Sequence, residues 1–369
     1  MINIFFEKLA KLVVNYSIKV KRGDRVYITG PTLAKELFQA LYIEIIKSGG
    51  HPFLLPLIEG IDVLRYKYAS EEQLKYVDPI RKLILKEFDG YIIIDADYNT
   101  RKFSLVDPEK IALVQGSPDQ RELWDILGSR LGKDGFNYLL VPFPCNALAQ
   151  EANMDLFSYI EFIKNALLLD KDDPVKEWSD LDQRQQNLCN LLGSVENIRI
   201  VGDDTDLKLS VKGRKWVNCS GKINLPDGEV CTTPLEYSAN GYIRFTFPGI
   251  YQGNEIENIY LEFKDGIVVH ASADKGQELL KEILKIENAN KLGEFAIGTN
   301  YGITRFTKHM LFDEKLGGTI HLALGAGIQL AGSNLESAIH WDILKDMKTP
   351  NSKIFADDKM IYQDGQWLI

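Results

Sequence analysis

Two of the five histidines in the chain lie in apolar segments, each close to an acidic residue. In segment 337–344, which alternates like a strand, His340 and Asp342 face the same side because strand side chains have a period of two. Two steps of strand rise place them about 7 Å apart, so both could reach a metal ion or a water between them. Imidazole and carboxylate are common donors for Zn²⁺ and other divalent metals. On this pattern alone, a surface pair or a core histidine bound to the aspartate is the more common explanation.

The second histidine, His321, lies in segment 317–325, a short apolar strand bounded by glycines. A single histidine among Ile, Leu and Ala is more often a hydrogen-bonded core residue than a metal ligand. The glycines, however, let a ligand or another backbone come close at both ends. His321 and His340 stand nineteen positions apart, and both have acidic neighbours. The metal site and the core interpretation therefore both stay open.

Carboxylates recur at the edges of neighbouring strand-like segments. Glu229 leaves a turn at the start of a strand, and Glu294 follows a glycine ahead of an apolar strand. Asp313 and Glu314 directly precede the His321 strand. A glutamate at a loop edge is usually just solvated, so spacing alone does not group these side chains.

The elements that would position these residues fall into an α/β half and an α+β half. Segment 25–29 predicts a strand, a helix opens at Pro31, and segment 51–56 predicts the next strand, which together indicate a β-α-β unit and a parallel sheet. Segments 91–95 and 138–142 are near-continuous apolar runs typical of buried parallel strands. We therefore expect residues 1–150 to form an α/β domain with a largely parallel sheet.

The second half has a different pattern. Residues 151–196 are expected to be a helical connection that is divided at Asp173-Pro174. Residues 197–369 are expected to be an α+β domain rich in antiparallel strands that carries the metal site. Its expected elements are strands at 207–211, 242–247, 258–263 and 267–271, a hairpin turn at 264–266, and a helix at 276–291.

Composition narrows the function classes. The chain has 369 residues, of which 45% are hydrophobic and 26% charged, as in soluble globular proteins. A net charge of −9 disfavours nucleic acid as a partner, and no apolar run approaches the ~20 residues needed to cross a membrane. The four cysteines lack a C-x-x-C spacing, which favours reduced thiols and a cytoplasmic location. Cys219 and Cys231 match no zinc pattern, so we expect them to be structural.

Several motifs together resemble the aminopeptidase T and aminopeptidase S family of metal-dependent aminopeptidases over most of the chain. The opening VKRGD at 20–24, GGHP at 49–52 and PCNALAQEANM at 144–154 are similar to that family. The strongest matches surround the candidate ligands and keep the family's order: LPDGEV at 225–230, LGE at 292–294, FDE at 312–314, GTIHLALG at 318–325 and SAIHWD at 337–342.

The resemblance implies two neighbouring divalent metals with one bridging carboxylate. The six implied ligands are Glu229, Glu294, Glu314, His321, His340 and Asp342. Zinc or cobalt is expected first, with manganese or magnesium as alternatives, because nitrogen and oxygen donors accept all four. Glu229 and Glu294 are the residues expected to act in catalysis, and for Glu229 the general-base and ligand roles both stay open.

The activity implied by the resemblance is removal of the N-terminal residue of peptides by a water that the two metals activate. The free α-amine of the substrate would bind a metal or a nearby carboxylate. Members of the family work as homodimers with the site in an enclosed cavity, so a homodimer is expected here too.

The chain departs from the family pattern in the loop after the first histidine. Ile328 stands where the family usually has a tyrosine, seven residues after His321, and AGSN at 331–334 replaces the usual GGKN. Cys145 stands where a threonine is common, and the interval between the two histidines is short. Isoleucine cannot donate a hydrogen bond to a tetrahedral oxyanion, and loss of one such donor costs roughly 10²–10³ in rate.

Ile328 motivates a second hypothesis, a relative that binds metal but is inactive or acts on another amide. A third hypothesis, a scaffold without chemistry, would make the histidines and acids ordinary residues. A dinucleotide site is excluded because no G-x-G-x-x-G follows the first strand, and there is no G-x-S-x-G elbow of a serine hydrolase.

Overall fold

The computed structural model describes residues 3–131 and 135–369. Contacts between Cα atoms divide the chain into two compact units. The first unit comprises Met1–Trp178 and Gly221–Leu225, and the second comprises Ser179–Ser220 and Pro226–Ile369. All six candidate metal ligands lie in the second unit.

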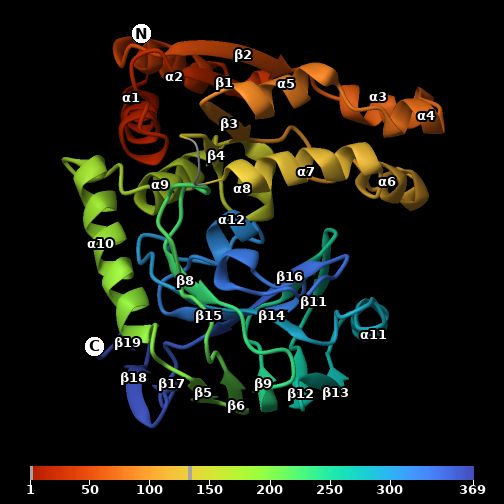
Figure 1. Ribbon diagram of the computed structural model, residues 1–369, viewed down its shortest axis with the longest axis vertical. Helices are drawn as coiled ribbons and strands as arrows, with labels where there is room; N and C mark the ends of the chain where they lie inside the picture. The colour runs from red at the N-terminus through yellow and green to blue at the C-terminus, as the bar shows by residue number, and fades with distance from the viewer. Residues whose placement is uncertain (1–2, 132–134) are drawn as a thin grey trace. The chain divides into compact units, whose positions relative to one another are not determined.

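The first unit is built on a four-stranded parallel sheet with the order β2-β1-β3-β4 (Figure 1). Its strands are β1 (Arg25–Pro31), β2 (His51–Leu57), β3 (Gly90–Asp95) and β4 (Asn137–Pro142). The apolar runs in β1, β3 and β4 are buried in the sheet, as expected for parallel strands that are covered on both faces. The predicted parallel α/β architecture of this half is confirmed.

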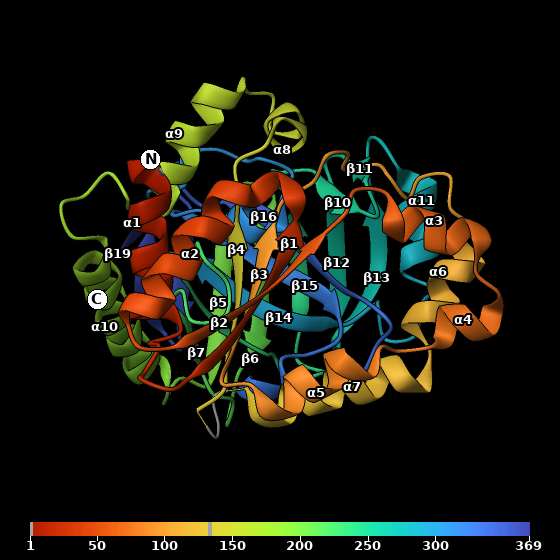
Figure 2. The same ribbon diagram turned by 90° about the horizontal axis from the view of Figure 1, so that it is seen from above.

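Helices accompany this sheet, and α5 and α7 pack against the face that carries Tyr27 and Tyr91 (Figure 2). The helix predicted to open at Pro31 begins later, at Lys35, because the chain stays extended through Pro31 and then makes a 3₁₀ turn. None of the helices in the described part of the chain is both long and apolar enough to span a membrane. The helices up to the boundary between the units are α1 (Ile4–Leu12), α2 (Lys35–Lys47), α3 (Ile61–Tyr68), α4 (Glu71–Lys75), α5 (Pro79–Glu87), α6 (Pro108–Gln115), α7 (Pro118–Arg130), α8 (Asn146–Glu151), α9 (Leu156–Ala166) and α10 (Pro174–Leu192), which crosses it.

The second unit contains two larger antiparallel sheets and a two-stranded ribbon of β10 and β11. The eight-stranded sheet has the order β13-β12-β9-β6-β5-β17-β18-β19, and the five-stranded sheet has the order β16-β15-β14-β8-β7. The antiparallel-rich α+β fold predicted for this half is confirmed. The strands are β5 (Asn197–Gly202), β6 (Thr205–Ser210), β7 (Val217–Cys219), β8 (Glu229–Thr232), β9 (Asn240–Arg244), β10 (Gly249–Tyr251), β11 (Asn254–Ile256), β12 (Tyr260–Lys264), β13 (Ile267–Ser272), β14 (Leu292–Gly298), β15 (Thr319–Gly325), β16 (His340–Asp346), β17 (Lys353–Ala356), β18 (Lys359–Gln363) and β19 (Gln366–Trp367).

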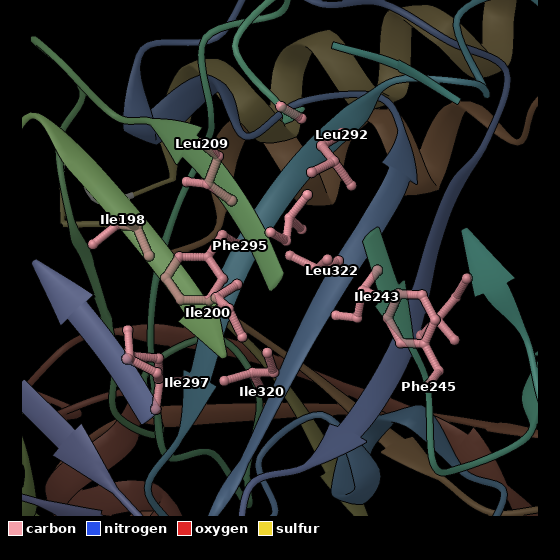
Figure 3. Close-up of a cluster of buried hydrophobic side chains, with 14 of the residues drawn as sticks. Ile198, Ile200, Leu209, Ile243, Phe245, Leu292, Phe295, Ile297, Ile320 and Leu322 are labelled. Carbon is pink, nitrogen blue, oxygen red and sulfur yellow. The ribbon is translucent and has the colours of Figure 1, made fainter. Parts of the chain in front are cut away.

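The core of the second unit contains apolar side chains from both sheets. Ile198 and Ile200 of β5 belong to the same buried cluster as Phe295 of β14 and Ile320 and Leu322 of β15 (Figure 3). Because side chains alternate along a strand, one face of the five-stranded sheet is committed to this core. Its other face is therefore available for polar residues.

Some predicted boundaries in this unit are wrong. The helix expected over 276–291 is the short α11 (Gln277–Ile283), since the chain turns through Asn288, which has a φ of 60°. The strand expected from residue 337 begins at His340, because the Ser337 hydroxyl accepts a hydrogen bond from the Ile339 amide and holds a turn there.

Candidate metal centre

The five-stranded sheet separates apolar from chemical side chains by strand alternation. In β14, Phe295 and Ile297 enter the core, whereas Glu294 and Ala296 face the opposite side. A bulge between Leu292 and Glu294 adjusts the alternation at the start of the strand. The same separation in β15 turns His321 away from the core, and in β16 it turns away His340 and Asp342, the pair predicted to share a face.

Small residues between the polar ones leave room for their side chains. Ala323 lies opposite Glu294 on one side and opposite Asp342 on the other. Ala296 in turn lies opposite His321. Because directly opposed residues have Cβ atoms about 5 Å apart, the longer side chains can converge above the two alanines.

Both histidines face carboxylates at short distance. His340 Nε2 is 2.9 Å from Glu294 Oε2 and 3.5 Å from Asp342 Oδ1. His321 Nε2 is 3.5 Å from both Glu229 Oε2 and Glu294 Oε1, and 3.9 Å from Asp342 Oδ1. The histidines thus belong to one cluster of donors and not to separate core positions.

All six residues expected as ligands fall into three overlapping groups, in each of which the donor atoms lie within 4.8 Å of one another. Glu294 is shared by the first two groups, His321 by the first and third, and Asp342 by the second and third. The groups are Glu229–Glu294–His321, Glu294–His340–Asp342 and Glu314–His321–Asp342.

Asp313 and Glu314, adjacent in the sequence, have different roles in the structure. Asp313 ends α12 (Met310–Asp313), and its carboxylate accepts hydrogen bonds from the amide and hydroxyl of Thr307 at 2.7 and 2.8 Å. Glu314, the next residue, joins the group with His321 and Asp342. Gly298 allows this segment to approach, since a Cβ there would lie 2.1 Å from the Leu316 carbonyl oxygen.

The donor set fits divalent metal ions. Its atoms are imidazole nitrogens and carboxylate oxygens, which zinc, cobalt and manganese accept. Within the described part of the chain, Glu229 Oε2, Asp342 Oδ1 and His321 Nδ1 are buried and have no hydrogen-bond partner. Buried polar atoms are normally paired, so unpaired oxygens that face the histidines are what a site for a cation requires.

A backbone hydrogen bond on the side away from the carboxylates fixes the orientation of the His340 ring. Its Nδ1 lies 2.7 Å from the Ala326 carbonyl oxygen, which can only accept, so Nδ1 carries the proton in this bond. Nε2 then faces Glu294 and Asp342, as in metal sites where a carbonyl holds the second ring nitrogen. Gly293 makes this approach feasible, because a Cβ at Gly293 would lie 2.1 Å from the same carbonyl oxygen.

Charge coupling changes the titration of the cluster in the metal-free chain. Burial disfavours the charged imidazoles, but the hydrogen bond to Glu294 and the nearby carboxylates raise the pKa of His321 from 6.5 to about 9. Burial likewise opposes the charge on His340, whose pKa the Asp342 and Glu294 carboxylates raise to about 12. Burial raises the pKa of Glu314 to about 7. For Glu294, the two histidines outweigh burial and hold the pKa well below its usual range.

These shifts predict how the stability of the metal-free protein depends on pH. A pKa raised in the folded state stabilises the fold fully below the unfolded value and less as pH rises through the folded value. The contribution of His321 is therefore complete below about 6.5 and is lost toward about 9. We therefore expect the melting temperature of chelator-treated protein to decrease as pH rises from about 6.5 to about 9. Differential scanning fluorimetry measures this decrease. Metal-loaded protein is the control, since bound histidines are already neutral. An unchanged melting temperature over this range in the metal-free protein would contradict the described coupling.

Two residues that support the cluster, Lys315 and Gln185, carry no recognisable signal in the sequence. Lys315 is buried, and Glu229, Glu314 and Asp227 outweigh that burial and raise its pKa well above the ordinary value. The side chain of Gln185 in α10 donates to the backbone carbonyl of Glu229 at 2.8 Å.

The cysteines expected to be structural lie closer to the cluster than their spacing indicated. All four cysteines are free thiols. The Sγ atoms of Cys219 and Cys231 are 3.8 Å apart, and both thiols form a further group of potential donors with Glu229.

The chain is similar to known proteins both in sequence and in structure. The chain is 27% identical to aminopeptidase 2 of Geobacillus stearothermophilus, with 98% of this chain and 97% of that protein covered. Its structure resembles wild-type AmpT from Thermus thermophilus with a TM-score of 0.85 at 21% identity, covering 99% of both chains. A more distant likeness, with a TM-score of 0.59 at 15% identity, is to the 2,5-dihydroxypyridine dioxygenase of Pseudomonas putida KT2440, covering 99% of this chain and 96% of that one.

The family is shown by a match that spans nearly the whole sequence, from residue 4 to residue 367. That span includes every residue of the candidate metal centre and nearly all of both compact units. The chain therefore belongs to the thermophilic metalloprotease family M29, a family of metal-dependent peptide hydrolases.

Proposed function

We propose that the chain is a metal-dependent aminopeptidase that hydrolyses the N-terminal residue of peptides with two divalent metals. The observation that carries this proposal is the convergence of two histidines and four carboxylates on one face of the five-stranded sheet, in groups that share donors. The named activity of the relative in Geobacillus stearothermophilus supports the same substrate class.

The shared donors suggest how two metals would be held. Glu229 and His321 would hold one metal, His340 and Asp342 would hold the other, and Glu294 would bridge them, as the member common to both groups. Glu314 reaches both positions through its group with His321 and Asp342 and would complete the set. Zinc or cobalt suits this mixture of imidazole and carboxylate best, with manganese or magnesium as alternatives.

Divalent metals bound there would polarise the scissile carbonyl and lower the pKa of a water. The chain itself would hold and orient the reacting groups. Glu229 and Glu294 are the carboxylates we propose to act in catalysis, because they line the same position beside His321 at 3.5 Å.

A surplus of carboxylates also accounts for a preference for the chain end. The α-amine of a peptide is a cation at neutral pH, whereas an internal peptide bond has no such charge. A cluster with four carboxylates would attract that amine and place the first peptide bond beside the metals. We therefore propose peptides with a free N-terminus as substrates.

We propose a homodimer in the cytoplasm as the working form. The free thiols of all four cysteines suit a reducing compartment. The first unit exposes apolar side chains along its edge strand β2 that suit contact with a second copy, since Phe53, Leu55 and Leu57 are each between 46% and 50% exposed.

The proposal is tested by hydrolysis of leucyl or other aminoacyl chromogenic amides by purified protein with added Co²⁺ or Zn²⁺. Activity should disappear with chelator and return when metal is restored. An N-acetylated version of the same substrate is the matched control and should resist cleavage. Absence of turnover with every aminoacyl substrate and metal would overturn the proposal.

A second candidate is a relative that binds metal but is inactive as a peptidase or acts on another amide. Ile328 favours this candidate because it removes a phenol that could stabilise an oxyanion. The fold likeness to a dioxygenase is a reminder that one fold hosts different reactions. This second candidate function predicts that the chain binds metal and that His321→Ala abolishes metal binding, while peptides remain intact.

A further inference from the structure

A buried lysine lies against the carboxylate side of the metal centre. Lys315 Nζ is 2.6 Å from Glu229 Oε1, 2.7 Å from Glu314 Oε1 and 3.6 Å from Asp227 Oδ1. Its side chain is 3% exposed, and those of Asp227 and Glu229 are 4% and 6% exposed. Lysine is rarely buried unless it is paired, so this environment is specific to a charged ammonium.

The ammonium lies among three carboxylates, two of which belong to candidate metal ligands. Carboxylate oxygens are the preferred ligands of hard cations such as Mg²⁺, Mn²⁺ and Ca²⁺. Three carboxylates that converge in a buried region need a positive charge among them, because an uncompensated buried charge is strongly unfavourable. Lys315 provides that charge from within the chain.

The two oxygens of Glu229 have different neighbours because one of them is bound by Lys315. Oε1 accepts the short hydrogen bond from Lys315, whereas Oε2 lies 3.5 Å from His321 Nε2 and has no hydrogen-bond partner among the described residues. One oxygen of Glu229 is thereby kept for Lys315, and the other faces the histidine side of the cluster.

We infer that Lys315 is a built-in cation of the metal centre, which fills its carboxylate side and confines divalent metals to the two histidine-bearing groups that share Glu294. This inference rests on the proposed function, because it takes the cluster to be a metal centre. Lys315 is a positioning residue in this role, since it acts through Glu229 and Glu314.

The test is the number of Mn²⁺ ions bound per folded chain, measured by equilibrium dialysis and elemental analysis. Manganese is the probe because it accepts both histidine and carboxylate donors. Wild type should bind two ions. Lys315→Met removes the charge and should bind one further ion, and Lys315→Gln, which keeps hydrogen-bond donors without the charge, should do the same if the methionine variant does not fold.

Lys345 offers a matched control. It is 1% exposed in the same unit, but its Nζ donates to the backbone carbonyls of Asp203 and Arg244 and, among the residues that the structure describes, to no carboxylate. Lys345→Met should therefore leave the number of bound ions at the wild-type value even where it lowers the melting temperature.

The outcomes separate the inference from the proposal on which it rests. If wild type binds two ions and folded Lys315→Met or Lys315→Gln also binds two, the inference is wrong and the metal centre stands. Three ions in wild type would likewise overturn it. If wild type binds no manganese, zinc or cobalt, the proposed function itself fails.

Discussion

Replacing Glu294 by alanine is expected to lower kcat/KM for aminoacyl amides by more than about 10³-fold, beyond the loss seen when a single oxyanion donor is removed elsewhere. Glu294 is the residue common to both groups proposed to hold the metals. Its two oxygens face different histidines, with Oε2 at 2.9 Å from His340 and Oε1 at 3.5 Å from His321. Removal of this side chain would therefore disturb both proposed metal positions together.

The loss must be separated from unfolding. Glu294 lies in β14, in the interior of the five-stranded sheet, so the melting temperature of the variant is measured beside its activity. Glu294→Gln keeps the shape of the side chain and removes its charge, and should lose activity while it stays folded. Glu278→Ala, at a position whose side chain is 83% exposed, is the matched control and should keep wild-type activity. Retention of activity within about threefold in folded Glu294→Ala would contradict a bridging role.

Replacing Ile328 by tyrosine is expected to raise kcat for aminoacyl amides by about 10²–10³-fold, the effect of one oxyanion donor. The loop that carries Ile328 is joined to the centre, because the Ala326 carbonyl oxygen accepts the bond from His340 Nδ1. The backbone holds the loop, since the Ile328 carbonyl accepts from the amides of Ala331 and Ser333. The side chain can therefore change while the loop keeps its shape.

The expected gain comes from the phenol hydroxyl of the tyrosine and not from the packing of its ring. Ile328→Phe adds the same ring without the phenol and should leave kcat near the wild-type value. If tyrosine and phenylalanine behave alike, the missing donor is supplied by another group, and the departure at Ile328 has no catalytic consequence.

The sequence predicted those parts of the centre that depend on strand alternation. His340 and Asp342 share a face because they are two positions apart in β16, and Glu229 begins β8 as the turn before it indicated. The parallel sheet of the first half followed from apolar runs that only buried strands tolerate. These features are local, so a single segment contains the information.

Contacts between distant segments could not be predicted in this way. Lys315 next to Glu314 is an ordinary charged pair in the sequence, and only the fold brings Glu229 and Asp227 to the same ammonium. Gly293 is unremarkable until the Ala326 carbonyl approaches it. Grouping of the carboxylates likewise depended on resemblance to a family and not on spacing.

Boundaries failed where side chains favour turns over regular elements. The helix expected to reach residue 291 ends at Ile283, and Asn288 adopts a left-handed conformation and donates to the Glu336 carbonyl. Asparagine tolerates that conformation better than most residues. The spacing of apolar residues contains no information about this backbone preference, so it did not predict the end of the helix.

The central claim is that this cluster binds two divalent metals through Glu294. Anomalous diffraction at the zinc edge, from crystals grown with Zn²⁺, tests it most directly. We expect two peaks, one bounded by Glu229, Glu294 and His321 and the other by Glu294, His340 and Asp342. Crystals with zinc in the solution but no anomalous peak among these side chains would contradict the account.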